Sequence, residues 1–159
     1  MRDLSLHLLD LVNNSIAAGA RHVDMAFRLA PGGALTMTVT DDGCGMDTDT
    51  AQRALGPFST SRTTRKVGLG LPLTQANARA TGGDLTIESH LGQGTTVTCV
   101  FYTRHIDCLP LGDLAQTIAA LVAAYPNSPE FALTMSSPNG ESAFSTRETR
   151  DVLAPVPLD

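Results

Sequence analysis

The sequence predicts an α/β fold, a two-layer sandwich in which helices cover one face of a mixed, largely antiparallel sheet. Three observations lead to this prediction. The chain opens on an amphipathic helical pattern, two pairs of strand-like segments are each joined by a glycine-containing turn, and further helical segments lie between these pairs. With 159 residues, the chain is long enough to bury the core of such a sandwich.

Periodicity and turn residues place each element in order. Gly19 ends the first helix, Asp47 is the expected N-cap of a short helix after Met46, and Pro72 suits the first turn of a longer helix. A segment rich in Ser, Thr and Arg has no period and is predicted to be a loop. In chain order we expect helix 4–16, strands 22–29 and 35–40, a helix from residue 47, loop 56–67, helix 72–81, and strands 85–89 and 95–102.

The last third of the chain forms a C-terminal extension in this prediction. We place a first domain at residues 1–104 and the extension at residues 105–159, packed on that domain or appended to it. The extension is expected to contain an amphipathic helix over residues 111–125 and a hairpin of residues 131–135 and 143–145 around Pro138-Asn139-Gly140-Glu141, with Asn-Gly as the turn.

Composition argues against several classes of function. The net charge is -5 and there is no long basic run, which argues against a nucleic-acid surface. No apolar stretch approaches a membrane span and no basic-then-apolar leader is present, so we expect a cytoplasmic protein without a membrane partner. The cysteines Cys44, Cys99 and Cys108 lack metal-ligand spacing and are interpreted as reduced thiols.

The first helix carries two polar residues that are candidates for binding or catalysis. Asp10 and Asn14 are four residues apart and therefore share a face, opposite the Leu/Val stripe. Taken alone, the solvated face of an amphipathic helix explains them.

A glycine-containing acidic segment, Thr40-Asp41-Asp42-Gly43-Cys44-Gly45-Met46, ends the second strand. Its two glycines permit positive φ and let a flat ligand approach the backbone closely. A buried carboxylate at Asp41 needs donors, which the exocyclic amine of a purine could supply. A tight turn capped by Asp explains the segment equally well.

A second glycine pair runs directly into a helix in Val67-Gly68-Leu69-Gly70-Leu71-Pro72-Leu73. Free N–H groups at a helix start suit a phosphate, and Arg62, Arg65 and Lys66 could offset its charge. A plain loop-to-helix junction is the alternative. The segment Gly92-Gln93-Gly94-Thr95 is, by itself, most simply a hairpin turn.

In this order, the segments resemble the four nucleotide boxes of the GHKL superfamily, which includes histidine kinases, gyrase, certain chaperones and mismatch-repair ATPases. The boxes are Asn14, Asp41-x-Gly43-x-Gly45, Gly68-x-Gly70 and Gly92-x-Gly94-Thr95. Pro57-Phe58-Ser59-Thr60 resembles the family's phenylalanine box in a flexible lid. Residues 11–20 are most similar to the mismatch-repair form of the first box, whereas residues 68–73 resemble histidine kinases and mitochondrial dehydrogenase kinases. The resemblance covers roughly residues 3–103 and implies the Bergerat ATP-binding fold.

The resemblance implies ATP and Mg²⁺ as cofactors and assigns a role to each matched residue. Asn14 would give its amide oxygen to Mg²⁺, and Asp41 would accept a hydrogen bond from the adenine amine. Gly43 and Gly45 would make room for the adenine ring, and Thr95 would help hold Asp41 and a bridging water. Gly68 and Gly70 would bind the phosphates. Arg62 and Lys66 would reach the terminal phosphate. Met46, Phe58 and Leu69 complete the implied nucleotide contacts.

Asp10 departs from the family pattern. The hydrolysing branches carry a Glu four residues before the Asn, where it activates the attacking water. Asp10 is the candidate general base here, but it is one methylene shorter, so we expect slow hydrolysis. Lys66-Val67-Gly68 also lacks the extra glycine of many kinases, which would stiffen the lid.

The reaction itself stays open between three classes. The first is an ATP-dependent kinase that phosphorylates a separate protein, favoured by residues 68–73. The second is a slow ATPase that signals its nucleotide state to a partner, favoured by residues 11–20 and Asp10. The third is a non-catalytic, anti-sigma-like binding module, which the presence of Asn14 and Asp41 disfavours. The first helix leaves no room for phosphoaccepting helices before it, and the four histidines (His7, His22, His90 and His105) are interpreted as structural or solvent-exposed, so we expect a separate protein partner.

Overall fold

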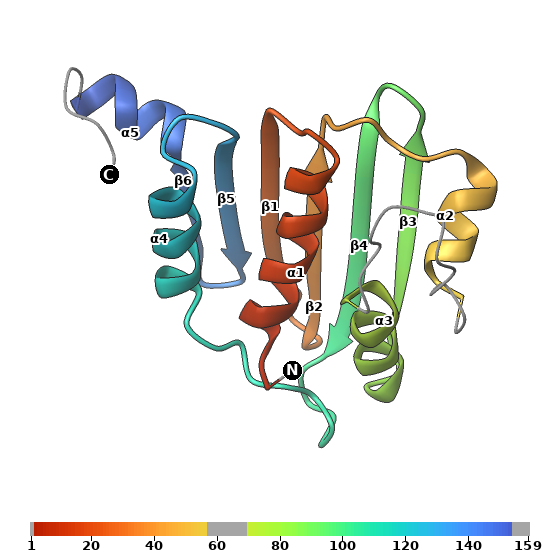
Figure 1. Cartoon of the computed structure of the whole chain (residues 1–159). Coiled ribbons are helices and arrows are strands. Elements are labelled where there is room, and N and C mark those ends of the chain that lie inside the picture. Colours follow the sequence, from red (N-terminus) through yellow and green to blue (C-terminus); the bar gives the residue numbers. More distant parts are fainter. Residues whose placement is uncertain (1, 57–69, 154–159) are drawn as a thin grey trace.

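The computed structural model describes residues 2–56 and 70–153, which form a single six-stranded sheet with helices packed against it (Figure 1). In chain order the elements are α1 (Leu4–Ala17), β1 (His22–Leu29), β2 (Ala34–Asp41), α2 (Thr48–Ala54), α3 (Gly70–Ala80), β3 (Asp84–His90), β4 (Gly94–Tyr102), α4 (Leu114–Ala124), β5 (Glu130–Ser137), β6 (Gly140–Ser145) and α5 (Thr146–Leu153). The strands lie in the order β3-β4-β2-β1-β5-β6. The predicted fold class is confirmed.

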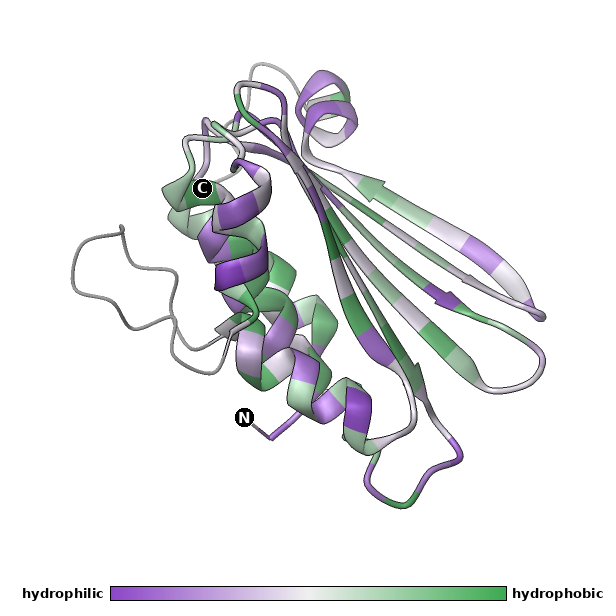
Figure 2. Cartoon of the chain, turned by 90° about the vertical axis from the view of Figure 1, so that its right-hand side faces the viewer, coloured by the Kyte–Doolittle hydropathy of each residue, from purple (hydrophilic) through white to green (hydrophobic). Residues whose placement is uncertain are grey.

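Helices α1, α3 and α4 lie over one face of the sheet, and the edge-on view separates this helical layer from the strands (Figures 1 and 2). Strand alternation explains the packing, because every second residue of β1 turns toward the helices. Val23, Met25 and Phe27 are buried in this way and share one hydrophobic core with the apolar stripe of α1. Burial of these side chains is the main force that holds the two layers together.

The predicted elements of the first domain are all present, with small shifts at their ends. Asp47 caps α2 as expected, and its side chain accepts a hydrogen bond from the N–H of Thr50. Helix α3 begins at Gly70, two residues before the predicted start, so Pro72 is its third residue. Proline is tolerated there because first-turn N–H groups need no intrahelical partner. The loop predicted over residues 56–67 lies almost wholly outside the described residues.

The C-terminal segment continues the same sheet. Strand β5 pairs parallel to β1, with Val23 opposite Phe131, and β6 pairs antiparallel to β5. The division of the chain at residues 104 and 105 stays a prediction. Helix α4 of this segment begins at Leu114, three residues later than predicted, because Gly112 has a positive φ of 80° and Asp113 forms the N-cap.

Two details of this segment differ from the sequence-based prediction. The hairpin turn is made by Pro138 and Asn139, because Ser137 pairs with Gly140, so the expected Asn-Gly turn is wrong. The fixed φ of proline suits the first central position of a turn, which moves Gly140 into the strand. Helix α5 was not predicted, since its only apolar residues are Val152 and Leu153 at its end, which is too few to show a helical period.

Candidate functional site

The carboxylate of Asp41, at the end of β2, is held from two sides. Its Oδ2 accepts a hydrogen bond from the Ser15 hydroxyl at 2.6 Å, and its Oδ1 accepts one from the Gly43 N–H at 2.9 Å. Ser15 belongs to α1, so the pair joins the helical layer to the sheet. A carboxylate offers about four lone pairs, so this half-buried group can accept a further donor from a ligand.

The two glycines after Asp41 are required by contacts within the protein. A Cβ on Gly43 would lie 2.8 Å from the Cβ of Ala18, and a Cβ on Gly45 would collide with the carbonyl oxygen of His90. Gly45 also has a positive φ of 68°. The segment is therefore clamped between the end of α1 and the β3–β4 turn, which fixes the orientation of Asp41.

Thr95 lies directly opposite Asp41 in the pairing of β2 with β4. Its hydroxyl contacts the Ser89 hydroxyl at 2.8 Å, and Ser89 Oγ accepts a hydrogen bond from the Met46 N–H at 2.7 Å. Ser89 thus joins two residues of the predicted site, Met46 and Thr95. The implied role of Thr95 in holding Asp41 through a water stays a prediction.

The other end of the site is formed where α1 meets α3. A Cβ on Gly70 would lie 3.1 Å from the Cβ and 3.2 Å from Oδ2 of Asp10, so Asp10 packs directly against the first residue of α3. Asn14 lies one turn further along α1 and is half-buried. The side chain of Asp10 therefore lies at the start of a helix, where N–H groups lack intrahelical partners.

The structure places eight predicted site residues on the elements that form these two ends of the site: Asp10, Asn14, Asp41, Gly43, Gly45, Met46, Gly70 and Thr95. Five more, Phe58, Arg62, Lys66, Gly68 and Leu69, lie outside the described residues. Ser15 and Ser89 contribute hydrogen bonds that sequence reasoning did not assign to them. Ser15 sits inside the first box, next to Asn14, and that position was the available signal.

Asp42, the neighbour of Asp41, is engaged elsewhere. Burial raises its pKa, but hydrogen bonds from the His22 ring and from the backbone N–H groups of Arg21 and His22 outweigh this and lower the pKa to about 2. This carboxylate ties the start of β1 to the end of β2. It is therefore a structural partner of His22, in keeping with the expectation that His22 is structural or exposed.

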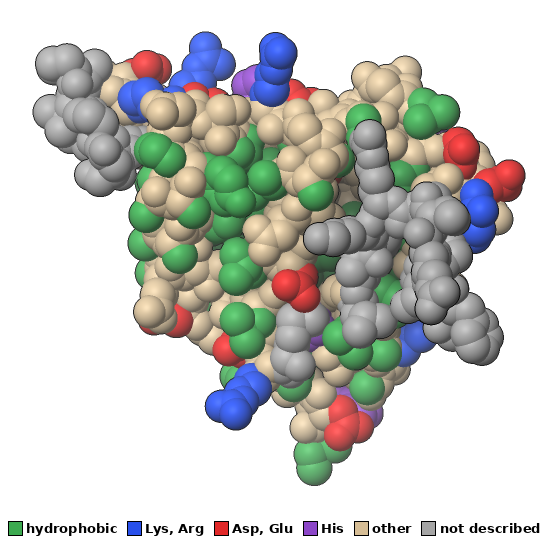
Figure 3. Space-filling model, in the orientation of Figure 1, with side chains coloured by type: hydrophobic (Ala, Val, Ile, Leu, Met, Phe, Trp, Pro, Cys, Tyr) green, Lys and Arg blue, Asp and Glu red, His purple; other side chains and the backbone are tan. Residues whose placement is uncertain are grey.

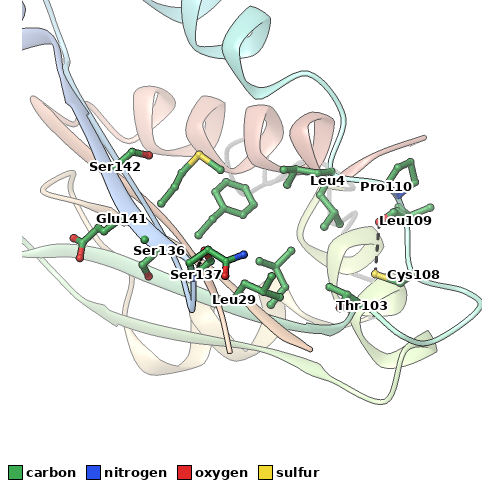
Figure 4. A pocket seen from close by; sticks show the side chains of 16 residues that line it. Leu4, Leu29, Thr103, Cys108, Leu109, Pro110, Ser136, Ser137, Glu141 and Ser142 are labelled. Carbon is green, nitrogen blue, oxygen red and sulfur yellow. Dashed lines mark hydrogen bonds between the residues drawn. The ribbon is translucent and has the colours of Figure 1, made fainter. Parts of the chain in front are cut away.

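A separate cavity of about 720 Å³ lies at the opposite end of the sheet (Figure 4). Apolar side chains including Leu4, Leu29 and Leu109 line one part of it, and polar ones including Ser136 and Glu141 line another. None of the predicted site residues that the structure describes takes part in this lining. The cavity is thus distinct from the site around Asp41.

Three further features of the described residues concern charge, metal ligands and membrane spans. The Arg side chains drawn in blue in Figure 3 are scattered around the rim of the visible face rather than gathered. Within residues 2–56 and 70–153, no group of three His, Cys, Asp or Glu side chains could hold a metal ion. No helix in the same ranges is long and apolar enough to cross a membrane.

The fold and the family match of the chain define an ATPase domain of the GHKL type. The chain belongs to the family of histidine kinase-, DNA gyrase B- and HSP90-like ATPases, which it matches over residues 2–105. The resemblance inferred from the nucleotide boxes is thereby confirmed.

Curated relatives point to two branches of this family. The chain is 32% identical over 134 residues to the histidine protein kinase DivJ of Caulobacter vibrioides, which covers 80% of this chain and 20% of DivJ. It is 36% identical over 110 residues to the non-motile and phage-resistance protein of the same organism, covering 63% of this chain and 13% of that protein. It is also 47% identical over 57 residues to the DNA mismatch repair protein MutL of Desulforudis audaxviator, covering 35% of this chain and 9% of MutL.

These relatives are much longer than the aligned region, since the chain spans a fifth of their length or less. Among solved structures, the N-terminal domain of a DNA repair protein matches with a TM-score of 0.63 at 16% identity, over 98% of this chain and 58% of that chain. At this identity the likeness concerns the fold. It extends beyond residue 105 and includes the C-terminal strands.

Proposed function

We propose that this domain binds Mg-ATP and uses it to phosphorylate, or to signal its nucleotide state to, a separate partner protein. The observation that carries the proposal is the Asp41 carboxylate, which Ser15 and Gly43 hold in a fixed orientation at the end of β2. The same helix that supplies Ser15 also carries Asn14 and places Asp10 against the start of α3. One helix therefore links an adenine-binding end to a phosphate-binding end.

At the adenine end, Asp41 would accept a hydrogen bond from the exocyclic amine. Because Ser15 and Gly43 already occupy one lone pair of each oxygen, the carboxylate is oriented before any ligand arrives. A preoriented acceptor loses little entropy on binding, which favours affinity. Met46, which is partly buried against the core, would border the ring.

At the phosphate end, the donor set fits a Mg-nucleotide. The amide oxygen of Asn14 is a hard oxygen ligand of the kind that Mg²⁺ accepts alongside water and phosphate. The first N–H groups of α3, at Gly70, suit phosphate oxygens. When bound, Mg²⁺ would neutralise phosphate charge. Phe58, Arg62, Lys66, Gly68 and Leu69 remain proposed contacts from the family resemblance.

The hypothesis of phosphotransfer to a partner is supported by relatives named as histidine kinases. A slow ATPase is the second candidate, and one observation favours it. Asp10 touches Gly70 at the start of α3, so its carboxylate lies beside the proposed phosphate site, where a base would activate water. The relative named as MutL supports this reading as well.

Incubation with labelled ATP, with and without candidate partner proteins, separates these outcomes. Label appearing on a partner supports phosphotransfer, and free phosphate without labelled protein supports the ATPase. Asp41→Asn is the control, since it should remove both signals. A chain that binds no Mg-ATP in calorimetry would refute the proposed function altogether.

A further inference from the structure

A buried histidine joins α1 to α3 next to the proposed phosphate site. His7 has no exposed surface, and neither has Thr74. The Nδ1 atom of His7 lies 2.8 Å from the Thr74 hydroxyl oxygen, and its Nε2 atom lies 2.7 Å from the amide nitrogen of Asn77. Both nitrogens of one ring on α1 therefore contact α3.

The chemistry of these partners determines where each hydrogen lies. The amide nitrogen of Asn77 can only donate, so Nε2 of His7 accepts. The ring is neutral, Nδ1 carries the hydrogen, and it donates to Thr74. Burial lowers the pKa of His7, which favours this neutral form. Thr74 in turn donates its own hydrogen to the carbonyl oxygen of Gly70 at 2.7 Å.

This chain of hydrogen bonds ends at a residue of the proposed site. His7 contacts Thr74, and one turn further along α1 and one turn back along α3 Asp10 packs against Gly70. These are two successive contacts, one helical turn apart, between α1 and α3. Apolar contacts tolerate sliding between helices, whereas a buried hydrogen bond is lost within a few tenths of an ångström of poor geometry.

We propose that His7 is a positioning residue for the nucleotide site. Through Thr74 it sets the register of α3 against α1, and thereby the position of Gly70 relative to Asp10. A slide of one residue along a helix is about 1.5 Å, which would move the first N–H groups of α3 away from the phosphates. The inference rests on the proposed function, because it assigns Gly70 and Asp10 to the phosphate end.

The first test compares Thr74→Val with Thr74→Ser. Valine keeps the shape of the side chain but removes both hydrogen bonds, whereas serine keeps the hydroxyl and loses a methyl group. We expect Thr74→Val to weaken Mg-ATP binding about tenfold and Thr74→Ser to change it less than about twofold, as measured by calorimetry. Val122→Ala in α4 is the control for general loss of stability, since Val122 is buried on a helix that carries no site residue.

The second test uses His7 itself. The side-chain nitrogen of Asn falls near the position of His Nδ1 and can donate as Nδ1 does, whereas the side-chain oxygen of Gln can take the position of Nε2 and accept as Nε2 does. His7→Asn therefore keeps the contact with Thr74, and His7→Gln keeps the contact with Asn77. If the hydrogen bond between His7 and Thr74 positions Gly70, the His7→Asn variant will bind Mg-ATP more tightly than the His7→Gln variant, by about threefold or more. The two variants should have similar unfolding temperatures.

The outcomes separate this inference from the proposed function. Wild type that binds Mg-ATP, together with equal affinities for the two Thr74 variants, would overturn the role of the hydroxyl. A Val122→Ala variant that loses as much affinity as Thr74→Val would show that stability alone is responsible. Nitrogen NMR that finds the hydrogen of His7 on Nε2 would overturn the bond directions. Wild type without Mg-ATP binding would instead refute the proposed function.

Discussion

The two ends of the candidate site are built in different ways. The end around Asp41 is made of backbone, with a strand, a cross-strand partner at Thr95 and glycines pressed against other main-chain atoms. The end around Asp10 and Gly70 depends on two helices that meet through side chains. The end around Asp41 resists displacement because any shift of its backbone would break hydrogen bonds between β2 and β4. The helix-built end can be displaced by changing single side-chain contacts, so the two ends should respond differently to substitution.

The largest effect is expected where the backbone is tightest. Gly45→Ala should destabilise the fold by about 3 kcal/mol, because the added Cβ would collide with His90 and the residue has positive φ. Gly92→Ala is the matched control, since Gly92 has φ of 76° but open space around it. It should cost only about 1 kcal/mol. Urea unfolding of both variants measures the difference, and equal losses would contradict a backbone clamp at Gly45.

Asp41→Asn tests the chemistry of the same end. Loss of the charge and of one acceptor should weaken ATP binding by about 1.5–3 kcal/mol, as measured by calorimetry. The control is Asp42→Asn, which removes the neighbouring carboxylate but leaves the site, because Asp42 bonds His22 and Arg21. If both substitutions weaken ATP binding alike, the adenine assignment is wrong.

At the helix-built end, Asp10 should govern rate rather than affinity. Asp10→Asn should abolish phosphate release while ATP affinity stays nearly unchanged, because a general base acts only on the attacking water. Asp10→Glu should speed hydrolysis roughly tenfold by extending the reach of the carboxylate. Phosphate release that is indifferent to both substitutions would remove the ATPase reading and leave phosphotransfer or binding alone.

Asn14→Ala should remove the Mg²⁺ contribution to ATP affinity, about 1 kcal/mol for one oxygen ligand among several. Asn14 is half-buried and lies outside the apolar stripe of α1, so the fold should persist. Titration of ATP with and without Mg²⁺ measures this. A variant whose affinity rises with Mg²⁺ as much as wild type would contradict the assignment.

The smallest effect concerns pH. Burial lowers the pKa of His7, partly opposed by Asp10 and Asp3, whereas the unfolded chain titrates near the ordinary value of 6.5. The unfolded state therefore binds more protons just below pH 6.5, so stability is full above that pH and declines as the pH falls. His7→Asn should flatten this decline in thermal unfolding between about pH 5 and 7.5. A wild-type unfolding temperature that rises on acidification in this window would contradict a neutral buried His7.

Local patterns in the sequence were enough to predict the elements that carry the site. Helical periodicity before Gly19, alternation in β1 and glycine spacing after Asp41 act over a few residues, so they can be read without a structure. The ordered boxes added the family and the two ends of the site. Asp41 and Gly70 were chosen on that basis, and the structure places both on elements that meet at α1.

Contacts between distant residues were decided by the tertiary structure alone. Ser15 meets Asp41 across 26 residues and His7 meets Thr74 across 67, distances over which no local pattern carries information. Parallel pairing of β5 with β1 likewise depends on which apolar faces meet in three dimensions. Short-range propensity specifies which segments form helices and strands. Only packing, which buries polar groups and so forces each to find a partner, specifies which side chains come together.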